Sequence, residues 1–214
     1  MPIAVKICGI TSAEAVEAAV AAGAQFGGLV FHPDSPRNLG LEQARMLADR
    51  MRGRLTVVAL IADMDDARID VLIRQVRPDF LQLHGGETAQ RVTEIRHKFG
   101  VPVIKALPIA EAADFDGVVE YENVADMLMF DARPPRGAAR GGGHGAAFDW
   151  TLLAGRRFAK PWFLAGGLTP ENVGRAAVLA QARMVDVSSG VESAPGVKDA
   201  ARIAQFINAT KMPA

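Results

Sequence analysis

A strand ending in a cysteine is predicted by the stretch Ala4-Val5-Lys6-Ile7-Cys8-Gly9-Ile10-Thr11, from which the rest of the chain can be interpreted. Side chains alternate between the two faces of a strand, so Lys6 and Cys8 share one face and Val5 and Ile7 share the other. We expect the aliphatic face to pack on helices and the polar face to border a site. Cys8 is the single cysteine of 214 residues. It is either a working thiol or, as free cysteines commonly are, a small buried hydrophobe.

Length and composition favour one globular domain spanning residues 1–214. The chain has 24 basic and 24 acidic residues, so no charge excess points to nucleic acid or to an anionic membrane as a partner. No apolar run has the length of a membrane span, and the first residues lack the pattern of a secretory signal. A single cysteine forms no internal disulfide, which favours a reducing compartment. We therefore expect a cytoplasmic protein.

Short apolar runs alternate with amphipathic stretches of helical period eight times along the chain, which is typical of repeated strand-helix units. The expected strands cover residues 4–8, 25–31, 55–61, 80–84, 103–107, 127–131, 162–165 and 184–187. The expected helices cover residues 12–22, 41–51, 66–77, 87–99, 170–180 and 197–210, with less regular ones near 110–119 and 149–154. Eight consecutive units favour a single-domain (β/α)8 TIM barrel, an α/β fold, over an open sheet.

A barrel of this kind carries its reactive residues at the C-terminal ends of its strands. Polar residues stand at or after five of the expected strand ends, namely Cys8, Arg37, His84, Asp131 and Asp186. By alternation, Gln82 shares a face with His84, and Met129 shares a face with Asp131. Polar groups inside a barrel are costly unless they bond to one another or to a ligand. We therefore expect one shared site at this end.

Two loops rich in glycine and serine are expected side by side after the seventh and eighth strands. Gly166 and Gly167 belong to the first loop, and Ser188, Ser189 and Gly190 form the second. Glycine lets backbone N–H groups approach an anion closely, and the loops after strands seven and eight are the usual phosphate position in this fold. Tight turns alone use the same residue types. The occurrence of both loops at these two strands favours a phosphate site.

Two further loops have features that suit ligand binding. Arg37 lies in the segment 31–39, which its prolines stiffen, and a guanidinium can hold a carboxylate bidentately. Most loop arginines are simply solvated, so the segment alone leaves this role open. The segment 132–145 after Asp131 is glycine-rich and long for a compact barrel. We expect it to close over a ligand as a lid.

Seven motifs, in order, resemble the phosphoribosylanthranilate isomerase family of tryptophan biosynthesis, and the resemblance runs from residue 3 to about 207. The motifs are Lys6-Ile7-Cys8-Gly9-Ile10-Thr11, Leu29-Val30-Phe31 through Ser35-Pro36-Arg37, Leu81-Gln82-Leu83-His84-Gly85-Gly86-Glu87, Phe130-Asp131, Gly142-Gly143-His144-Gly145 with Phe148-Asp149-Trp150, Ala165-Gly166-Gly167-Leu168, and Asp186-Val187-Ser188-Ser189-Gly190-Val191-Glu192. The segment 132–147 departs from the family pattern: it is longer and richer in Arg and Ala, and His144 replaces the common hydroxyl.

The resemblance implies an Amadori rearrangement of N-(5-phosphoribosyl)anthranilate to 1-(2-carboxyphenylamino)-1-deoxyribulose 5-phosphate, with no cofactor or metal. It makes Asp131 the general acid that protonates the furanose ring oxygen and Cys8 the general base that removes the proton from sugar carbon 2. Arg37 would hold the anthranilate carboxylate and Asp186 would orient the sugar. His84 would either contact the substrate or serve as a structural hydrogen-bonding group. The phosphate would bind to the two glycine and serine loops.

A thiol that acts as a base needs a pKa below its usual value, and Lys6 on the same face is one candidate cause. Lys6 could instead neutralise an acidic residue inside the barrel. Two rival classes fit less well. The histidine-pathway isomerase resembles two fused half-barrels with an aspartate in each and two phosphate sites, whereas this chain has Cys8 and one phosphate cradle. A non-catalytic phosphate-binding barrel has no physical reason to keep both Cys8 and Asp131. The expected partner is a small phosphorylated molecule, bound by a monomer or a homodimer.

Overall fold

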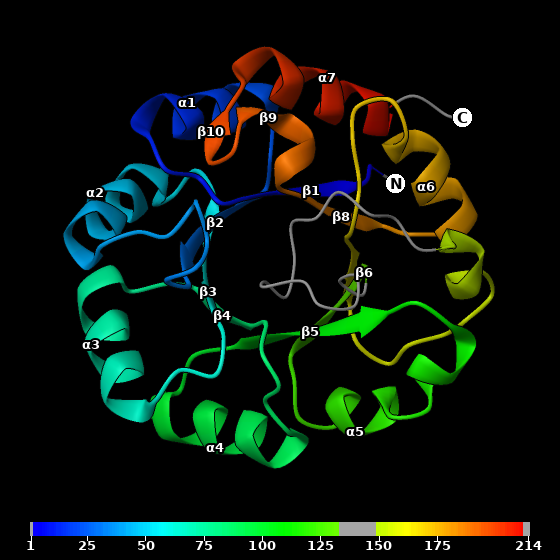
Figure 1. Cartoon of the computed structure of the whole chain (residues 1–214), viewed down its shortest axis with the longest axis horizontal. Helices are drawn as coiled ribbons and strands as arrows, with labels where there is room; N and C mark the ends of the chain where they lie inside the picture. Colours follow the sequence, from blue (N-terminus) through cyan, green and yellow to red (C-terminus); the bar gives the residue numbers. More distant parts are fainter. Residues whose placement is uncertain (1, 133–148, 212–214) are drawn as a thin grey trace.

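The computed structural model describes residues 2–132 and 149–211. Eight parallel strands close into a barrel in sequence order, and the helices form a ring around it (Figure 1). The barrel strands are β1 (Ala4–Cys8), β2 (Phe26–Phe31), β3 (Thr56–Ile61), β4 (Phe80–Leu83), β5 (Val103–Ile109), β6 (Met127–Ala132), β7 (Trp162–Leu164) and β8 (Met184–Val187). The expected TIM barrel is confirmed.

The helices begin and end largely where the sequence places caps. They are α1 (Ala13–Ala22), α2 (Leu41–Met51), α3 (Asp66–Val76), α4 (Ala89–Phe99), α5 (Val118–Glu122), α6 (Val173–Ala180) and α7 (Ala200–Lys211). Ser12, Asp65 and Thr88 accept hydrogen bonds from the first turns of α1, α3 and α4. Gly23 ends α1 with a left-handed φ of 94°. None of the helices in the described ranges is long and apolar enough to cross a membrane.

The structure differs from expectation at the less regular helices and near the C-terminus. The last helix begins at Ala200 rather than 197, because residues 197–198 form β10 (Val197–Lys198) and pair with β9 (Glu192–Ala194) in a hairpin. The weak helix expected near 110–119 is a short 3-10 turn, η1 (Ala112–Phe115), followed by α5. The turns near 149–154 and after β8 are also 3-10, as η2 (Trp150–Leu153) and η3 (Ser189–Val191).

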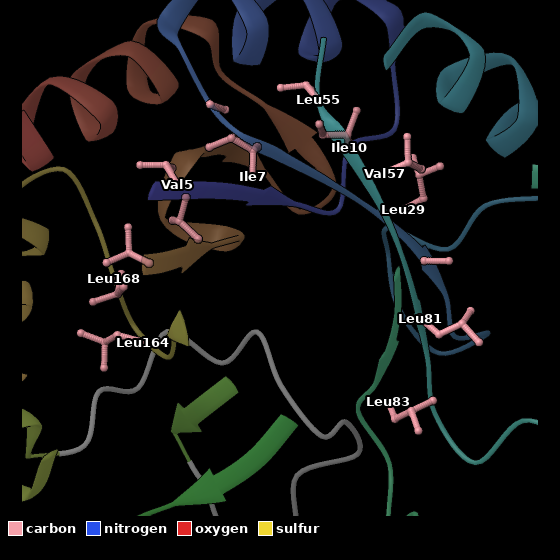
Figure 2. Close-up of a cluster of buried hydrophobic side chains, with 14 of the residues drawn as sticks. Val5, Ile7, Ile10, Leu29, Leu55, Val57, Leu81, Leu83, Leu164 and Leu168 are labelled. Carbon is pink, nitrogen blue, oxygen red and sulfur yellow. The ribbon is translucent and has the colours of Figure 1, made fainter. Parts of the chain in front are cut away.

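The strands divide apolar side chains between two layers. Val5 and Ile7 of β1 and Leu29 of β2 are buried on the side of the barrel that the helices cover (Figure 2). A second cluster fills the barrel interior, and its buried members are Val58, Ile104, Ala106, Met129, Phe163 and Ala165. Met129 is two residues before Asp131 on β6, so Asp131 lies on the same inward face, one step nearer the C-terminal mouth. This apolar cluster therefore packs the barrel interior below Asp131.

Candidate active site

A buried lysine lies beside both a carboxylate and the thiol on the β8-β1-β2 side of the barrel mouth. Lys6 and Asp186 are register partners on β1 and β8, and Lys6 Nζ donates to Asp186 Oδ1 at 2.8 Å. Gly28 on β2 leaves room for Lys6 and Cys8, since a Cβ there would lie 3.1 Å from Lys6 Nζ and 3.2 Å from Cys8 Sγ. The three polar side chains therefore face the barrel interior, as alternation along β1 predicts.

Burial raises the pKa of the Cys8 thiol above its ordinary value. The Lys6 ammonium lowers that pKa in part, the Asp186 carboxylate raises it further, and the Lys198 ammonium lowers it. The expectation of a thiol pKa below the usual range is therefore wrong. Burial lowers the pKa of Lys6, but Asp186 and Cys8 together outweigh burial, so the pKa of Lys6 lies above its ordinary value. Lys6 thus takes the alternative role of neutralising an acidic residue inside the barrel.

Arg37 is held by a carboxylate of the protein itself. Its Nε and Nη2 donate to Glu192 Oε1 and Oε2 at 2.6 and 2.7 Å. Glu192 Oε1 also accepts from Lys198 Nζ at 2.7 Å, and the three side chains are almost completely buried. The Arg37 stem packs on Gly9, where any Cβ would collide with it. The guanidinium is thereby fixed beside the residue that follows Cys8, and Nη1 is the nitrogen that Glu192 does not engage.

Glu192 and Lys198 are functional candidates that sequence reasoning missed. Both come from the β9-β10 hairpin, which lies near β1 and α1 in Figure 1. The hairpin turn is the dipeptide Pro195-Gly196, with a φ of 82° at the glycine, so a turn signal was present in the sequence. Thr11 Oγ1 donates to the Gly196 carbonyl at 2.8 Å and ties the hairpin to the end of β1.

A second polar cluster lies on the β4 and β6 side of the mouth. Gln82 Nε2 lies 2.9 Å from His84 Nδ1, and His84 Nε2 lies 3.2 Å from Asp131 Oδ2. The Ala132 N–H donates to Asp131 Oδ1 at 2.9 Å. The closed strand order sets β4 across the ring from β8, and β6 across from β2. Asp131 on β6 and Cys8 on β1 both lie at this mouth, and β7 and β8 separate their strands around the ring.

The two glycine and serine loops touch each other, as expected. Gly166 and Gly167 have left-handed φ values of 86° and 66°. A Cβ at Gly190 would collide with the carbonyl oxygen of Leu168, so the loop after β8 packs directly on the loop after β7. Lys198 Nζ donates to the Ser188 carbonyl at 3.0 Å, which puts a cation behind the second loop. Beyond Ala132, the segment expected to act as a lid falls outside the described residues.

Comparison with known proteins points to one family. A family model described as "N-(5'phosphoribosyl)anthranilate (PRA) isomerase" matches residues 5–209. The N-(5'-phosphoribosyl)anthranilate isomerase of Paramagnetospirillum magneticum is 51% identical over 211 residues, which covers 99% of this chain and 98% of the relative. That of Paracoccus denitrificans is 51% identical over 213 residues, covering 100% and 99%.

Solved structures agree with these relatives. Phosphoribosyl anthranilate isomerase from Thermotoga maritima superposes with a TM-score of 0.87 at 33% identity, covering 98% of both chains. A phosphoribosyl anthranilate isomerase in complex with reduced 1-(o-carboxyphenylamino)-1-deoxyribulose 5-phosphate gives a TM-score of 0.84 at 32% identity, again covering 98% of both chains. On the family model and on full-length identity near one half, the chain belongs to the N-(5'-phosphoribosyl)anthranilate isomerase family.

Proposed function

We propose that Cys8 and Asp131 are the general base and general acid with which this chain isomerises N-(5-phosphoribosyl)anthranilate to 1-(2-carboxyphenylamino)-1-deoxyribulose 5-phosphate, a step of tryptophan biosynthesis. One observation carries the proposal. A thiol at the end of β1 and a carboxyl near the end of β6 face the same mouth, on strands that β7 and β8 separate. An acid and a base that act on different atoms of one sugar need this kind of separation.

The chemistry divides into two proton transfers. Asp131 donates a proton to the furanose ring oxygen as the bond from that oxygen to carbon 1 breaks, and the nitrogen lone pair forms a Schiff base. The Cys8 thiolate then takes the proton from carbon 2. The electron pair of that C–H bond forms the carbon 1 to carbon 2 double bond, and the Schiff-base π electrons return to nitrogen. The resulting enolamine relaxes to the ketone. Asp131 ends ionised and Cys8 protonated, and exchange with solvent restores both.

Charge on the β8-β1-β2 side suits an anionic substrate that carries both a carboxylate and a phosphate. Lys6, Arg37 and Lys198 supply three positive charges there against the two carboxylates of Asp186 and Glu192. We assign the anthranilate carboxylate to the edge of Arg37 that carries Nη1, because Glu192 engages Nε and Nη2. Asp186 orients the sugar from its fixed place beside Lys6.

The phosphate is assigned to the paired loops at residues 166–167 and 188–190. Their close packing and successive left-handed glycines favour backbone N–H groups that converge on an anion. Lys198 adds a buried positive charge next to Ser188. The substrate would then span the mouth, with its phosphate at β7 and β8 and its sugar between Cys8 and Asp131.

An assay with purified protein tests this function. Phosphoribosylanthranilate is added and its consumption is followed by fluorescence, with the substrate of the histidine-pathway isomerase in a parallel reaction. Rapid conversion of phosphoribosylanthranilate alone, or of both compounds, supports the proposal. Turnover of the histidine-pathway substrate alone would contradict it, and so would phosphate-dependent binding without turnover of either compound.

We further infer a reducing, cytoplasmic setting, because the base assigned here is a single thiol that must stay unoxidised. The T. maritima relative is described as dimeric. We propose that this chain is a monomer or a homodimer, and light scattering of the purified protein distinguishes these two states from larger assemblies.

A further inference from the structure

We propose that His84 is a positioning residue for Asp131. Its imidazole holds the carboxyl in place and donates a hydrogen bond that strengthens as Asp131 gives up its proton. Gln82 sets the tautomer that makes this possible. The inference rests on the proposed acid role of Asp131 and goes beyond it, because it assigns His84 to the acid rather than to the substrate.

Both ring nitrogens of His84 are already engaged by the protein. Nδ1 lies 2.9 Å from Gln82 Nε2, and Nε2 lies 3.2 Å from Asp131 Oδ2. No ring nitrogen is left over for a substrate atom while these two contacts persist. This geometry favours the structural alternative for His84 over direct substrate contact.

The orientation of Gln82 determines which nitrogen carries the proton. Gln82 is fully buried, and its Nε2 group, which only donates, faces Nδ1. With the amide in this orientation Nδ1 accepts, so we infer that the neutral imidazole carries its proton on Nε2 and points it at Asp131. Gln82 Oε1 is buried with no hydrogen-bond partner in the described part of the chain. An unpaired buried oxygen is costly, which suggests that the amide serves a purpose other than stability.

The main chain on either side of His84 is tied down. The His84 N–H donates to the Ile61 carbonyl on β3 at 2.9 Å. Gly85 gives its N–H to Glu87 Oε2 at 3.0 Å, and its carbonyl accepts from Lys105 Nζ at 2.7 Å. Lys105 and Glu87 form a buried ion pair at 2.8 Å. These main-chain contacts hold the imidazole within hydrogen-bond distance of Asp131.

A hydrogen bond from His84 to Asp131 Oδ2 stabilises the transition state in which Asp131 transfers its proton. Negative charge develops on the carboxyl as the proton leaves, and a hydrogen bond to a charged acceptor is about twice as strong as one to a neutral acceptor. The contribution is therefore larger in the transition state than before proton transfer, which is the condition for raising kcat. Ala132 N–H already serves the other oxygen, so His84 completes the support of both.

The test compares His84→Leu, which removes the donor, with His84→Gln, whose amide can donate from a similar position. We expect His84→Leu to lower kcat about 10- to 100-fold with KM within about 3-fold, and His84→Gln to recover most of the loss. His97→Leu, on the exposed face of α4, is the matched control and should leave both constants unchanged. A raised KM at unchanged kcat in His84→Leu, or equal losses in the Leu and Gln variants, would overturn the inference.

Two further measurements separate this inference from the acid assignment itself. In an Asp131→Asn background, measured at high enzyme concentration, adding His84→Leu should lower kcat further by less than about 2-fold. If the double variant instead loses the product of the two single losses in kcat, the inference alone is overturned. Normal turnover of Asp131→Asn would instead overturn the acid assignment. Nitrogen-15 NMR of the His84 ring, which needs no activity, should show the Nε2–H tautomer in the wild type and a mixture in Gln82→Met. A wild-type Nδ1–H tautomer would contradict the role of Gln82.

Discussion

Lys6 Nζ lies 2.8 Å from Asp186 Oδ1 inside the barrel, where the lysine has no exposed surface. The Asp186 carboxylate offsets part of the effect that the lysine charge has on the pKa of Cys8. This explains why burial prevails and the pKa of the thiol lies above its ordinary value despite a cation on the same strand. The Cys8 thiol therefore ionises at a higher pH than an ordinary thiol, and the ammonium groups of Lys6 and Lys198 limit this rise in its pKa.

Lys6→Met should lower the free energy of unfolding by about 3–5 kcal/mol, because it leaves the buried carboxylate of Asp186 without its partner. Urea denaturation measures the change. The double variant Lys6→Met with Asp186→Leu should recover most of the loss, since apolar side chains of similar size replace a buried pair at little cost. A double variant that loses the sum of the two single changes would show that the pair does not act as a unit.

Lys198→Met should raise the pKa of Cys8 further, because it removes a cation that favours the thiolate. The chain has one cysteine and one tyrosine. In a Tyr121→Phe background, which removes the tyrosine titration, thiolate absorbance near 240 nm reports the ionisation of Cys8. The wild-type midpoint should lie above 9.0, the ordinary value, and that of Lys198→Met higher still. The alkaline rise of kcat/KM should move to higher pH by the same amount. The control Lys211→Met, at the exposed end of α7, should leave the midpoint in place. An unchanged or lower midpoint in Lys198→Met would show that the Lys198 charge does not lower the pKa of Cys8.

Arg37→Met should raise KM about 10- to 100-fold with kcat within about 3-fold, because a buried charge-assisted contact to the substrate carboxylate is lost. The control ligand is the aniline analogue that lacks the carboxylate, which should bind the wild type and the variant equally. Arg74→Met, an exposed residue of α3, controls for general charge removal. Equal weakening for both ligands would mean that Arg37 acts through Glu192 and the hairpin rather than on the carboxylate.

Gly190→Ala should force the loops after β7 and β8 apart, because the new methyl group would collide with the Leu168 carbonyl. We expect a loss of about 1–3 kcal/mol in the free energy of unfolding and weaker binding of inorganic phosphate. Gly117→Ala is the matched control, since its φ is −91° and nothing lies within 4 Å of the added carbon. Phosphate affinity that survives in Gly190→Ala would move the phosphate site away from these loops.

The barrel and its inward-facing residues could be predicted because they follow from local periodicity. Alternation along β1 correctly separated Lys6 and Cys8 from Val5 and Ile7. The partner of Arg37 was not predictable in this way, because Glu192 lies 155 positions away and meets it only after β8 closes against β1. The expected helix start at residue 197 missed the two-residue strand β10, because a hairpin this short has almost no periodic pattern in its sequence. The thiol pKa depends on burial and on Asp186, neither of which a single strand reveals.

The catalytic pair is tested most directly by the kcat of Cys8→Ala and of Asp131→Asn, each measured beside its affinity for the reduced product analogue. We predict that either change lowers kcat by about 10²- to 10⁴-fold while the affinity for the analogue stays within about 3-fold. Near-normal kcat in either variant would contradict the account, because that residue would then not transfer a proton to or from the substrate.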